Sequence, residues 1–345
     1  MNTVLGKVCV ACGSVMSRTG KPWLFRCSTC GYYSSSLSPR IRDSEPSAAI
    51  DEGRREQALG RLRNSNFERV LDRLGQARQG RLGTLLDVGC AHGWFIQAAR
   101  RRGYAACGID PDPAMHAMAS AAGLEVWLGF FPGDIPDGLT FDVISFNDAF
   151  EHLPDPGNAI SVCRERLSEG GHLVINIPSS RGFFYQTAAL LDRIGVPGPF
   201  DRMWQRQFAS PHLSYFNCDN LRELADRNGL REVHRSTLPS LSLPHLWPRL
   251  RYDRGSSVIA SGAIFLAVAC VTPLLRLFPA DISLQVFCRV SDAEGTTNPQ
   301  HAPSISRDEL SSDLSETTLR GGYVDCSSHR RSSRIGTSYT QSRKS

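Results

Sequence analysis

From Thr84 onward, short apolar runs alternate with amphipathic stretches along the chain. The runs are "TLLDV", "YAACGID", "LEVWLG", "FDVISFN" and "GHLVINI". Runs of four to eight apolar residues separated by helix-length segments are typical of buried parallel strands joined by crossover helices. The pattern therefore predicts an α/β fold that begins near residue 81.

Other segments follow different patterns. Residues 41–80 are charged, with apolar positions at helical spacing, and predict a helical linker. Residues 181–216 are rich in aromatic side chains and predict an irregular insertion. The stretch "NCDNLRELADRNGLREVHR" predicts a capped helix followed by a strand. Residues 291–345 hold Ser, Thr, Arg and Gly with few large apolar residues, and predict a disordered tail.

Composition adds limits to this picture. The 345 residues, 41% of them hydrophobic, suffice for one sizeable domain with attachments. The net charge of +5 is too small to indicate a nucleic-acid partner by itself. The first residues, "MNTVLGKVCVACGS", lack the pattern of a secretory signal. Eleven cysteines in such a chain are expected to be reduced thiols or metal ligands, which favours a cytoplasmic location.

Two C-x-x-C pairs lie within residues 1–40. Cys9 and Cys12 form the first pair, Cys27 and Cys30 the second, and a glycine follows each pair. Four thiolates at this spacing suit tetrahedral Zn²⁺, and a module this small has too little core to fold without a metal. All four ligand positions are filled, so we expect a structural zinc ribbon.

A glycine-rich turn follows the first strand, in "DVGCAHGWF". Such a turn between a strand and a helix lets backbone N–H groups approach a ligand closely. An acid at Asp110, about twenty residues further on, can bind ribose hydroxyls. The segment therefore predicts a nucleoside site.

The spacing Asp87-x-Gly89-x-Ala91-x-Gly93 resembles motif I of class I S-adenosylmethionine-dependent methyltransferases, with alanine in place of the middle glycine. Alanine permits the same close approach if its φ stays negative. The resemblance implies a Rossmann-like, mostly parallel sheet of seven strands. It also implies that the turn lines the methionine part of S-adenosylmethionine and that Asp110 accepts the ribose hydroxyls.

The resemblance continues in "FDVISFNDAFEHLPDP" and "LSEGGHLVINIP", and covers about residues 84–235. These segments are similar to a subgroup that includes the ubiquinone-biosynthesis O-methyltransferases. The resemblance implies that Asn147 and Asp148 lie beside the donor, with Glu151 and His152 just beyond them. The family's adenine-contacting acid has no clear counterpart, because Phe130 or Asp134 could occupy its place.

An acceptor that loses a proton needs a base near the reacting atom. The family commonly places a histidine before the helix that begins near Asn217, so His212 in "SPHLSYFN" is the first candidate and His152 the second. The alternative is that His212 merely holds its loop in place.

One apolar stretch, Ser256 to Leu275, has no charge and is about as long as a membrane span. Arginines flank it at positions 249, 251, 254 and 276. The sixth and seventh strands of this fold, "LREVHRS" and "SLQVFCRV", lie on either side, and a single crossing would separate them. We therefore expect residues 256–278 to form a helix that lies in the membrane interface or re-enters it, or one packed on its own domain or in a dimer.

These observations predict a zinc-ribbon-like module at 1–40, a helical linker at 41–80 and a class I methyltransferase domain at 81–290. The predicted function is methyl transfer from S-adenosylmethionine to a small-molecule or lipid-linked acceptor, in the cytoplasm or at the inner face of the membrane. The alternatives are an RNA methyltransferase whose ribbon binds ribosomal RNA, and a donor-binding protein without catalysis. The ribbon carries few cations, which disfavours RNA. The sequence determines neither the acceptor nor the oligomeric state.

Overall fold

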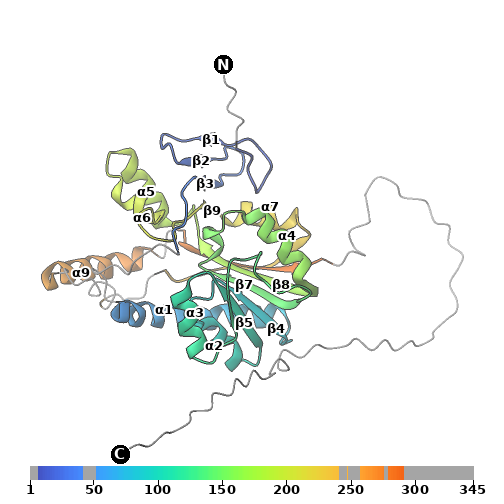
Figure 1. The fold of residues 1–345 in the computed structure, drawn as a ribbon. Coiled ribbons are helices and arrows are strands. Elements are labelled where there is room, and N and C mark those ends of the chain that lie inside the picture. The colour runs from blue at the N-terminus through green and yellow to red at the C-terminus, as the bar shows by residue number, and fades with distance from the viewer. Residues whose placement is uncertain (1–6, 42–51, 241–246, 248–256, 276–278, 291–345) are drawn as a thin grey trace, which may run out of the picture. The chain divides into compact units, whose positions relative to one another are not determined.

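The computed structural model describes residues 7–41, 52–240, 247, 257–275 and 279–290 (Figure 1). All of these residues belong to one compact unit, Met1–Thr297. The tail predicted at 291–345 lies outside the described residues.

Seven strands form the main sheet: β4 (Thr84–Val88), β5 (Ala105–Asp110), β6 (Val126–Leu128), β7 (Phe141–Asn147), β8 (Leu167–Pro178), β10 (Leu230–Leu238) and β11 (Ile282–Arg289). Their order across the sheet is β10-β11-β8-β7-β4-β5-β6. Strands β4 to β8 run parallel, whereas β11 is antiparallel to both β8 and β10. The predicted mostly parallel seven-stranded sheet is confirmed.

Five helices pack against this sheet: α1 (Glu52–Ala77), α2 (Trp94–Arg101), α3 (Pro113–Ala121), α4 (Pro156–Arg166) and α7 (Cys218–Asp226). The starts of three follow from local sequence. Asp112 and Asp155 each cap a helix whose first residue is proline, and Asn217 with Asn220 forms a capping box. The side-chain oxygens satisfy backbone N–H groups that have no partner within the helix.

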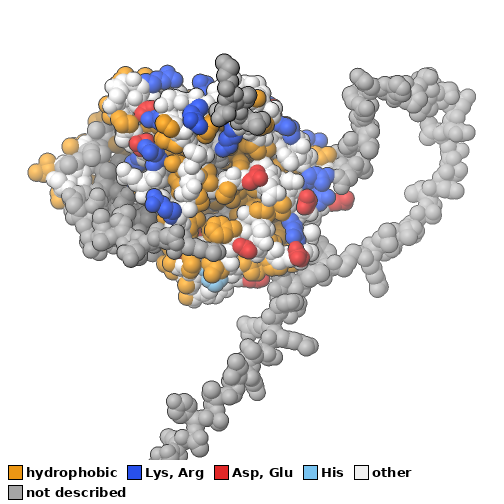
Figure 2. Space-filling view, turned by 45° about the horizontal axis from the view of Figure 1, so that its top comes forward, with side chains coloured by type: hydrophobic (Ala, Val, Ile, Leu, Met, Phe, Trp, Pro, Cys, Tyr) orange, Lys and Arg blue, Asp and Glu red, His pale blue; other side chains and the backbone are white. Residues whose placement is uncertain are grey.

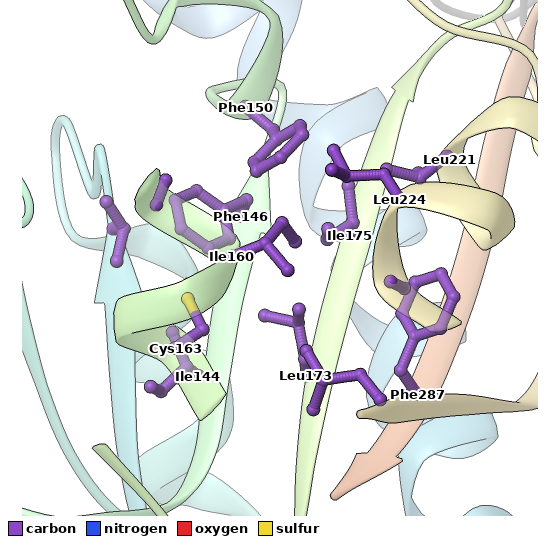
Figure 3. Close-up of a cluster of buried hydrophobic side chains, with 14 of the residues drawn as sticks. Ile144, Phe146, Phe150, Ile160, Cys163, Leu173, Ile175, Leu221, Leu224 and Phe287 are labelled. Carbon is purple, nitrogen blue, oxygen red and sulfur yellow. The ribbon is translucent and has the colours of Figure 1, made fainter. Parts of the chain in front are cut away.

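The core has two layers because side chains of a buried strand alternate between the faces of the sheet. Ile144 and Phe146 of β7 join the cluster covered by α4 and α7, which Figure 3 shows together with Leu173 and Ile175 of β8. Val143 joins the second cluster, on the face covered by α1 and α2. Both faces are therefore apolar, as a parallel sheet requires.

The N-terminal ribbon shares its sheet with a distant strand. Its strands are β1 (Ser17–Arg18), β2 (Leu24–Arg26) and β3 (Tyr33–Ser35), and β9 (Ser214–Tyr215) completes the order β1-β2-β3-β9. Tyr33 is paired with Tyr215 in the antiparallel β3–β9 ladder. The ribbon is therefore hydrogen-bonded to the segment that precedes α7.

The predicted irregular insertion at 181–216 is wrong. The segment forms α5 (Phe183–Arg193), the short helix α6 (Gly198–Met203) and β9. Tyr185, Phe200 and Trp204 are buried in a third cluster with Leu24 of the ribbon. Because these aromatic side chains pack against a partner far away in sequence, the local pattern does not reveal the helices.

The apolar stretch forms α9 (Val258–Leu275). Ile259, Ala263, Leu266 and Cys270 are all exposed, and their spacing of four, three and four residues places them on one helix face. Among the described helices, none has the length and apolar character needed to cross a bilayer. The predicted helix between the last two strands is confirmed, and its apolar face is open.

Candidate active site

The turn after β4 is built from three residues in the left-handed region of backbone space. The φ angles are 70° at Gly89, 45° at Ala91 and 72° at Gly93. A Cβ atom on Gly89 would lie 2.7 Å from the Cβ of Ala149, so this position admits no side chain. The φ at Ala91 is positive, so the condition under which alanine replaces glycine without strain is not met, and an alanine in this region costs about 1–2 kcal/mol.

Asp110, at the end of β5, is hydrogen-bonded to the backbone of this turn. Its Oδ2 accepts a hydrogen bond from Ala91 N at 2.7 Å, and its Oδ1 accepts one from Asp112 N at 2.9 Å. Burial raises the pKa of Asp110, although both N–H groups favour the carboxylate. A carboxylate has about four acceptor positions, so two remain for ligand hydroxyls.

Asp87, at the end of β4, lies in a buried polar network. Ser145 Oγ donates to its Oδ1 at 2.9 Å and Asn147 Nδ2 donates at 2.8 Å. Asn147 Oδ1 in turn accepts from Asn176 Nδ2 at 2.6 Å. Burial raises the pKa of Asp87 to about 7, and the two donated hydrogen bonds oppose this rise. Asp87 therefore fixes the orientation of the Asn147 side chain.

Two cavities meet at the glycine turn. The larger has a volume of about 420 Å³, which is the usual size of a cofactor pocket, and the smaller about 90 Å³. Gly89 and Asp148 line both. The larger cavity is also lined by Asp110, Met115, Phe130, Phe131, His152 and Ser210. The smaller is also lined by Arg63, Asp87, Ala91, His92, Trp94 and Asn147.

The structure thus brings together the residues predicted for the donor. Asp148 has a φ of 52°, and its carboxylate lies 4.0 Å from the Arg63 guanidinium. Strained backbone at such a position is common in binding sites. Phe130 lines the larger cavity, whereas Asp134 lies behind it and accepts a hydrogen bond from Phe130 N at 2.7 Å.

Sequence reasoning missed the contributions of Pro39, Ile41, Ala209 and Ser210 to the larger cavity. These residues lie far from the glycine turn in sequence, and no local pattern marks them. They belong to the segment after the ribbon and to the segment before β9.

His152 and His212 lie in contact, with ring centroids 4.8 Å apart. His152 Nδ1 lies 2.9 Å from the carbonyl oxygen of Pro211, so it donates there and leaves Nε2 as the basic nitrogen. Gln205 Nε2 donates to His212 Nε2 at 2.8 Å. Burial lowers the pKa of both histidines. Of the two, only His152 is among the described residues that line the larger cavity.

Glu151 lies behind these histidines and is buried. Its Oε1 is 4.0 Å from His212 Nε2. Burial raises the pKa of Glu151 well above its ordinary value, so the carboxyl group favours its neutral form. Donor atoms of Glu151, His152 and His212 lie within 4.8 Å of one another, a spacing that can also hold a metal ion.

The four cysteines of the ribbon converge. Cys9 Sγ lies 3.5 Å from Cys30 Sγ, and Cys12 Sγ lies 3.4 Å from Cys27 Sγ. Zinc–thiolate bonds of about 2.3 Å in a tetrahedron place sulfur atoms about 3.8 Å apart. Gly13 and Gly31, after the two pairs, have φ angles of 77° and 75°. The donor set and the turns fit a zinc ion.

The mostly parallel sheet, the glycine turn and the buried acid after β5 together define an α/β protein of Rossmann-like architecture. A family model described as a methyltransferase domain matches residues 55–235, which is more than half of the chain. The chain therefore belongs to the class I S-adenosylmethionine-dependent methyltransferase family.

Curated relatives are ubiquinone biosynthesis O-methyltransferases. The protein of that name from Alkalilimnicola ehrlichii is 31% identical over 153 residues, which cover 41% of this chain and 61% of the relative. The one from Caulobacter vibrioides is 33% identical over 129 residues, which cover 35% of this chain and 48% of the relative. The chain thus spans less than two thirds of the length of these relatives.

Solved structures similar to this chain have low sequence identity to it. A methyltransferase from Archaeoglobus fulgidus overlaps with a TM-score of 0.42 and 16% identity, covering 66% of this chain and 94% of that one.

The raised pKa of Asp87 predicts a pH dependence of stability. Between its ordinary pKa of 3.8 and about 7, the folded chain binds a proton at this carboxyl group that the unfolded chain has lost. The free energy of unfolding therefore falls as the pH rises through this range. Asp87→Asn should flatten the fall, measured as urea midpoints across the same pH range.

Asp137→Asn, at an exposed carboxylate, serves as the control and should leave the slope unchanged. An Asp87→Asn slope equal to that of the unmodified protein would contradict the assignment.

Proposed function

We propose that this protein transfers a methyl group from S-adenosylmethionine to an oxygen atom of a small-molecule acceptor. One observation carries the proposal: Asp110 and the glycine turn line one cavity of cofactor size, and the Asp110 carboxylate retains acceptor capacity there. The names of the curated relatives support oxygen as the methylated atom.

The larger cavity is lined by both polar and apolar side chains. Asp110 would accept the ribose hydroxyls, and Met115, Phe130 and Phe131 offer an apolar surface for a planar base. The left-handed turn would direct its backbone toward the methionine part, beside Asn147 and Asp148. S-adenosylmethionine supplies, when bound, a methyl group activated by its sulfonium charge. The chain itself has to align the acceptor and exclude water.

Donor binding tests the proposal directly. Titration calorimetry should detect S-adenosylhomocysteine binding by the unmodified protein. Asp110→Asn should weaken it by about 10- to 100-fold, because hydrogen bonds to a charged group contribute about 1.5–3 kcal/mol. Asp137→Asn is the matched control outside the cavity. The proposal fails if neither S-adenosylmethionine nor S-adenosylhomocysteine produces heat with folded protein.

We further propose that His152 is the general base and His212 a positioning residue. His152 lines the cavity and holds its proton at Nδ1, so its Nε2 can accept a proton from the acceptor. His212 already accepts a hydrogen bond at Nε2 and packs against the His152 ring. This reverses the order in which the resemblance ranked the two histidines.

The two histidines are distinguished by different measurements. His152→Ala should lower turnover by at least about 100-fold while donor affinity stays within twofold. His212→Ala should retain activity but move the acidic limb of the pH profile upward, because His152 loses part of its burial. Turnover is measured with methyl-labelled donor and a small-molecule extract of a strain lacking the protein. Full turnover by His152→Ala would remove this histidine from the mechanism.

For the ribbon, we propose one structural zinc ion held by Cys9, Cys12, Cys27 and Cys30. With four thiolates no position is left for a substrate, so the metal's contribution is to fold the module. Metal analysis should find one zinc per chain. Cys27→Ser should lose the zinc and lower the melting temperature, whereas Cys270→Ser, at an exposed cysteine of α9, should do neither. Retention of full zinc by Cys27→Ser would contradict the site.

A lipid-linked acceptor is favoured by one further observation, the open apolar face of α9. Ile259 is 85% exposed and Leu266 is 65% exposed. We propose that this face lies in a membrane interface. Vesicles of phosphatidylglycerol and phosphatidylcholine should sediment the protein. Ile259→Glu should weaken binding by about tenfold or more, and Ile194→Glu, at an exposed position of the segment after α5, should not. Failure of the unmodified protein to sediment would rule out this role.

A further inference from the structure

A second large cavity lies between the ribbon and the helices after β8. Its volume is about 630 Å³, within the range of ligand pockets. Strands β1, β2 and β3 form one side, and α5 and α6 form the other. We call it the ribbon cavity. It shares no lining residue with the two cavities at the glycine turn.

Positive charge predominates in the ribbon cavity. Arg18, Lys21, Arg26 and Arg193 line it, and Asp192 is the single carboxylate among its described lining residues. Asp192 pairs with Lys21 at 2.7 Å. The three arginines have no carboxylate within ion-pair distance in the described part of the chain. A concave surface with charge of one sign concentrates anions.

Aromatic rings lie beside these cations. The Arg26 guanidinium lies 5.6 Å from the ring centre of Tyr33, and Lys21 Nζ lies 5.4 Å from that of Phe200. The cavity therefore offers flat apolar surface within reach of guanidinium groups. Figure 2, turned toward the face that carries the ribbon, shows lysine and arginine side chains interspersed with hydrophobic ones.

Tyr185 adds a third, almost fully buried ring to the cavity lining. It lines the cavity and is 2% exposed. Its Oη is enclosed by protein atoms beside the Trp204 indole, so Tyr185 contributes its ring and not its hydroxyl to the cavity.

We propose that the ribbon cavity binds an organic phosphate. Arg18, Arg26 and Arg193 hold the phosphate oxygens, because guanidinium groups match them in geometry and charge. Tyr33 and Phe200 pack against the organic part of the ligand. The observations favour a small molecule over RNA, because the cations converge on a bounded cavity the size of a nucleotide instead of following an extended track.

Uridine diphosphate, pyrophosphate and uridine are suitable probes for calorimetry. Each titration contains saturating S-adenosylhomocysteine and is repeated with the Asp110→Asn variant. These two measures exclude heat from ligand binding in the larger cavity at the glycine turn. Uridine diphosphate should bind more tightly than pyrophosphate, and uridine should bind least. Arg18→Ala and Arg193→Ala should each weaken uridine diphosphate binding by about tenfold.

Arg231→Ala, at an exposed arginine of β10 outside the cavity, should bind as the unmodified protein does. Retained donor binding and zinc content show that the variants are folded. The absence of heat with uridine diphosphate, or unchanged affinity in both arginine variants, would overturn the proposal.

Binding of a 20-nucleotide RNA, measured by fluorescence anisotropy, tests whether the ribbon cavity belongs to an RNA-binding surface instead. Binding tighter than that of uridine diphosphate, lost steeply with salt and insensitive to added uridine diphosphate, would assign this surface to RNA and overturn the proposal.

Discussion

The parallel register of β4, β5 and β7 is the constraint on which the candidate active site depends. Val88 is paired with Ile109 on one side and with Phe146 on the other, so the three strands end at one edge of the sheet. Asp87, Asp110 and Asn147 stand at these ends. Parallel strands collect the residues that follow them at a single edge, where the glycine turn opens. Loss of this register would separate the acid from the turn that it holds.

The pairing of β3 with β9 connects the ribbon to the catalytic fold. Two ladder positions and the aromatic cluster around Trp204 join them. As a result, the ribbon contributes to two cavities. The segment after the ribbon, with Pro39 and Ile41, lines the larger cavity at the glycine turn, and the strands of the ribbon line the ribbon cavity. A zinc ion that orders the ribbon would therefore influence both sites without touching a ligand.

Several groups in the candidate active site lower the free energy of unfolding. Asp87 and Glu151 are buried carboxyl groups with raised pKa values, and Ala91 and Asp148 have left-handed backbone. Each feature costs free energy that packing elsewhere offsets. All four lie at the ends of β4 and β7 or just beyond them, where a ligand site needs fixed polar groups and open backbone. The surrounding apolar clusters hold them in place.

The sequence by itself determined the fold class, the glycine turn with its acid at position 110 and the two cysteine pairs. These signals are local: strand periodicity, the conformational freedom of glycine and the short reach between paired thiols follow from residues close together in the chain. The alternation around Ile144 and Phe146 made the buried strands visible in the same way.

Tertiary structure alone decided the features that depend on distant segments. Ala91 combines a positive φ with a hydrogen bond from its N–H to Asp110, and the helices of residues 181–216 form where their aromatic side chains meet the ribbon. Access of His152, and not His212, to the larger cavity at the glycine turn depends on how the segment before β9 packs. The ribbon cavity combines Arg18 and Arg26 with Arg193, which no local pattern connects. Such juxtapositions arise from long-range pairing, which sequence periodicity does not encode.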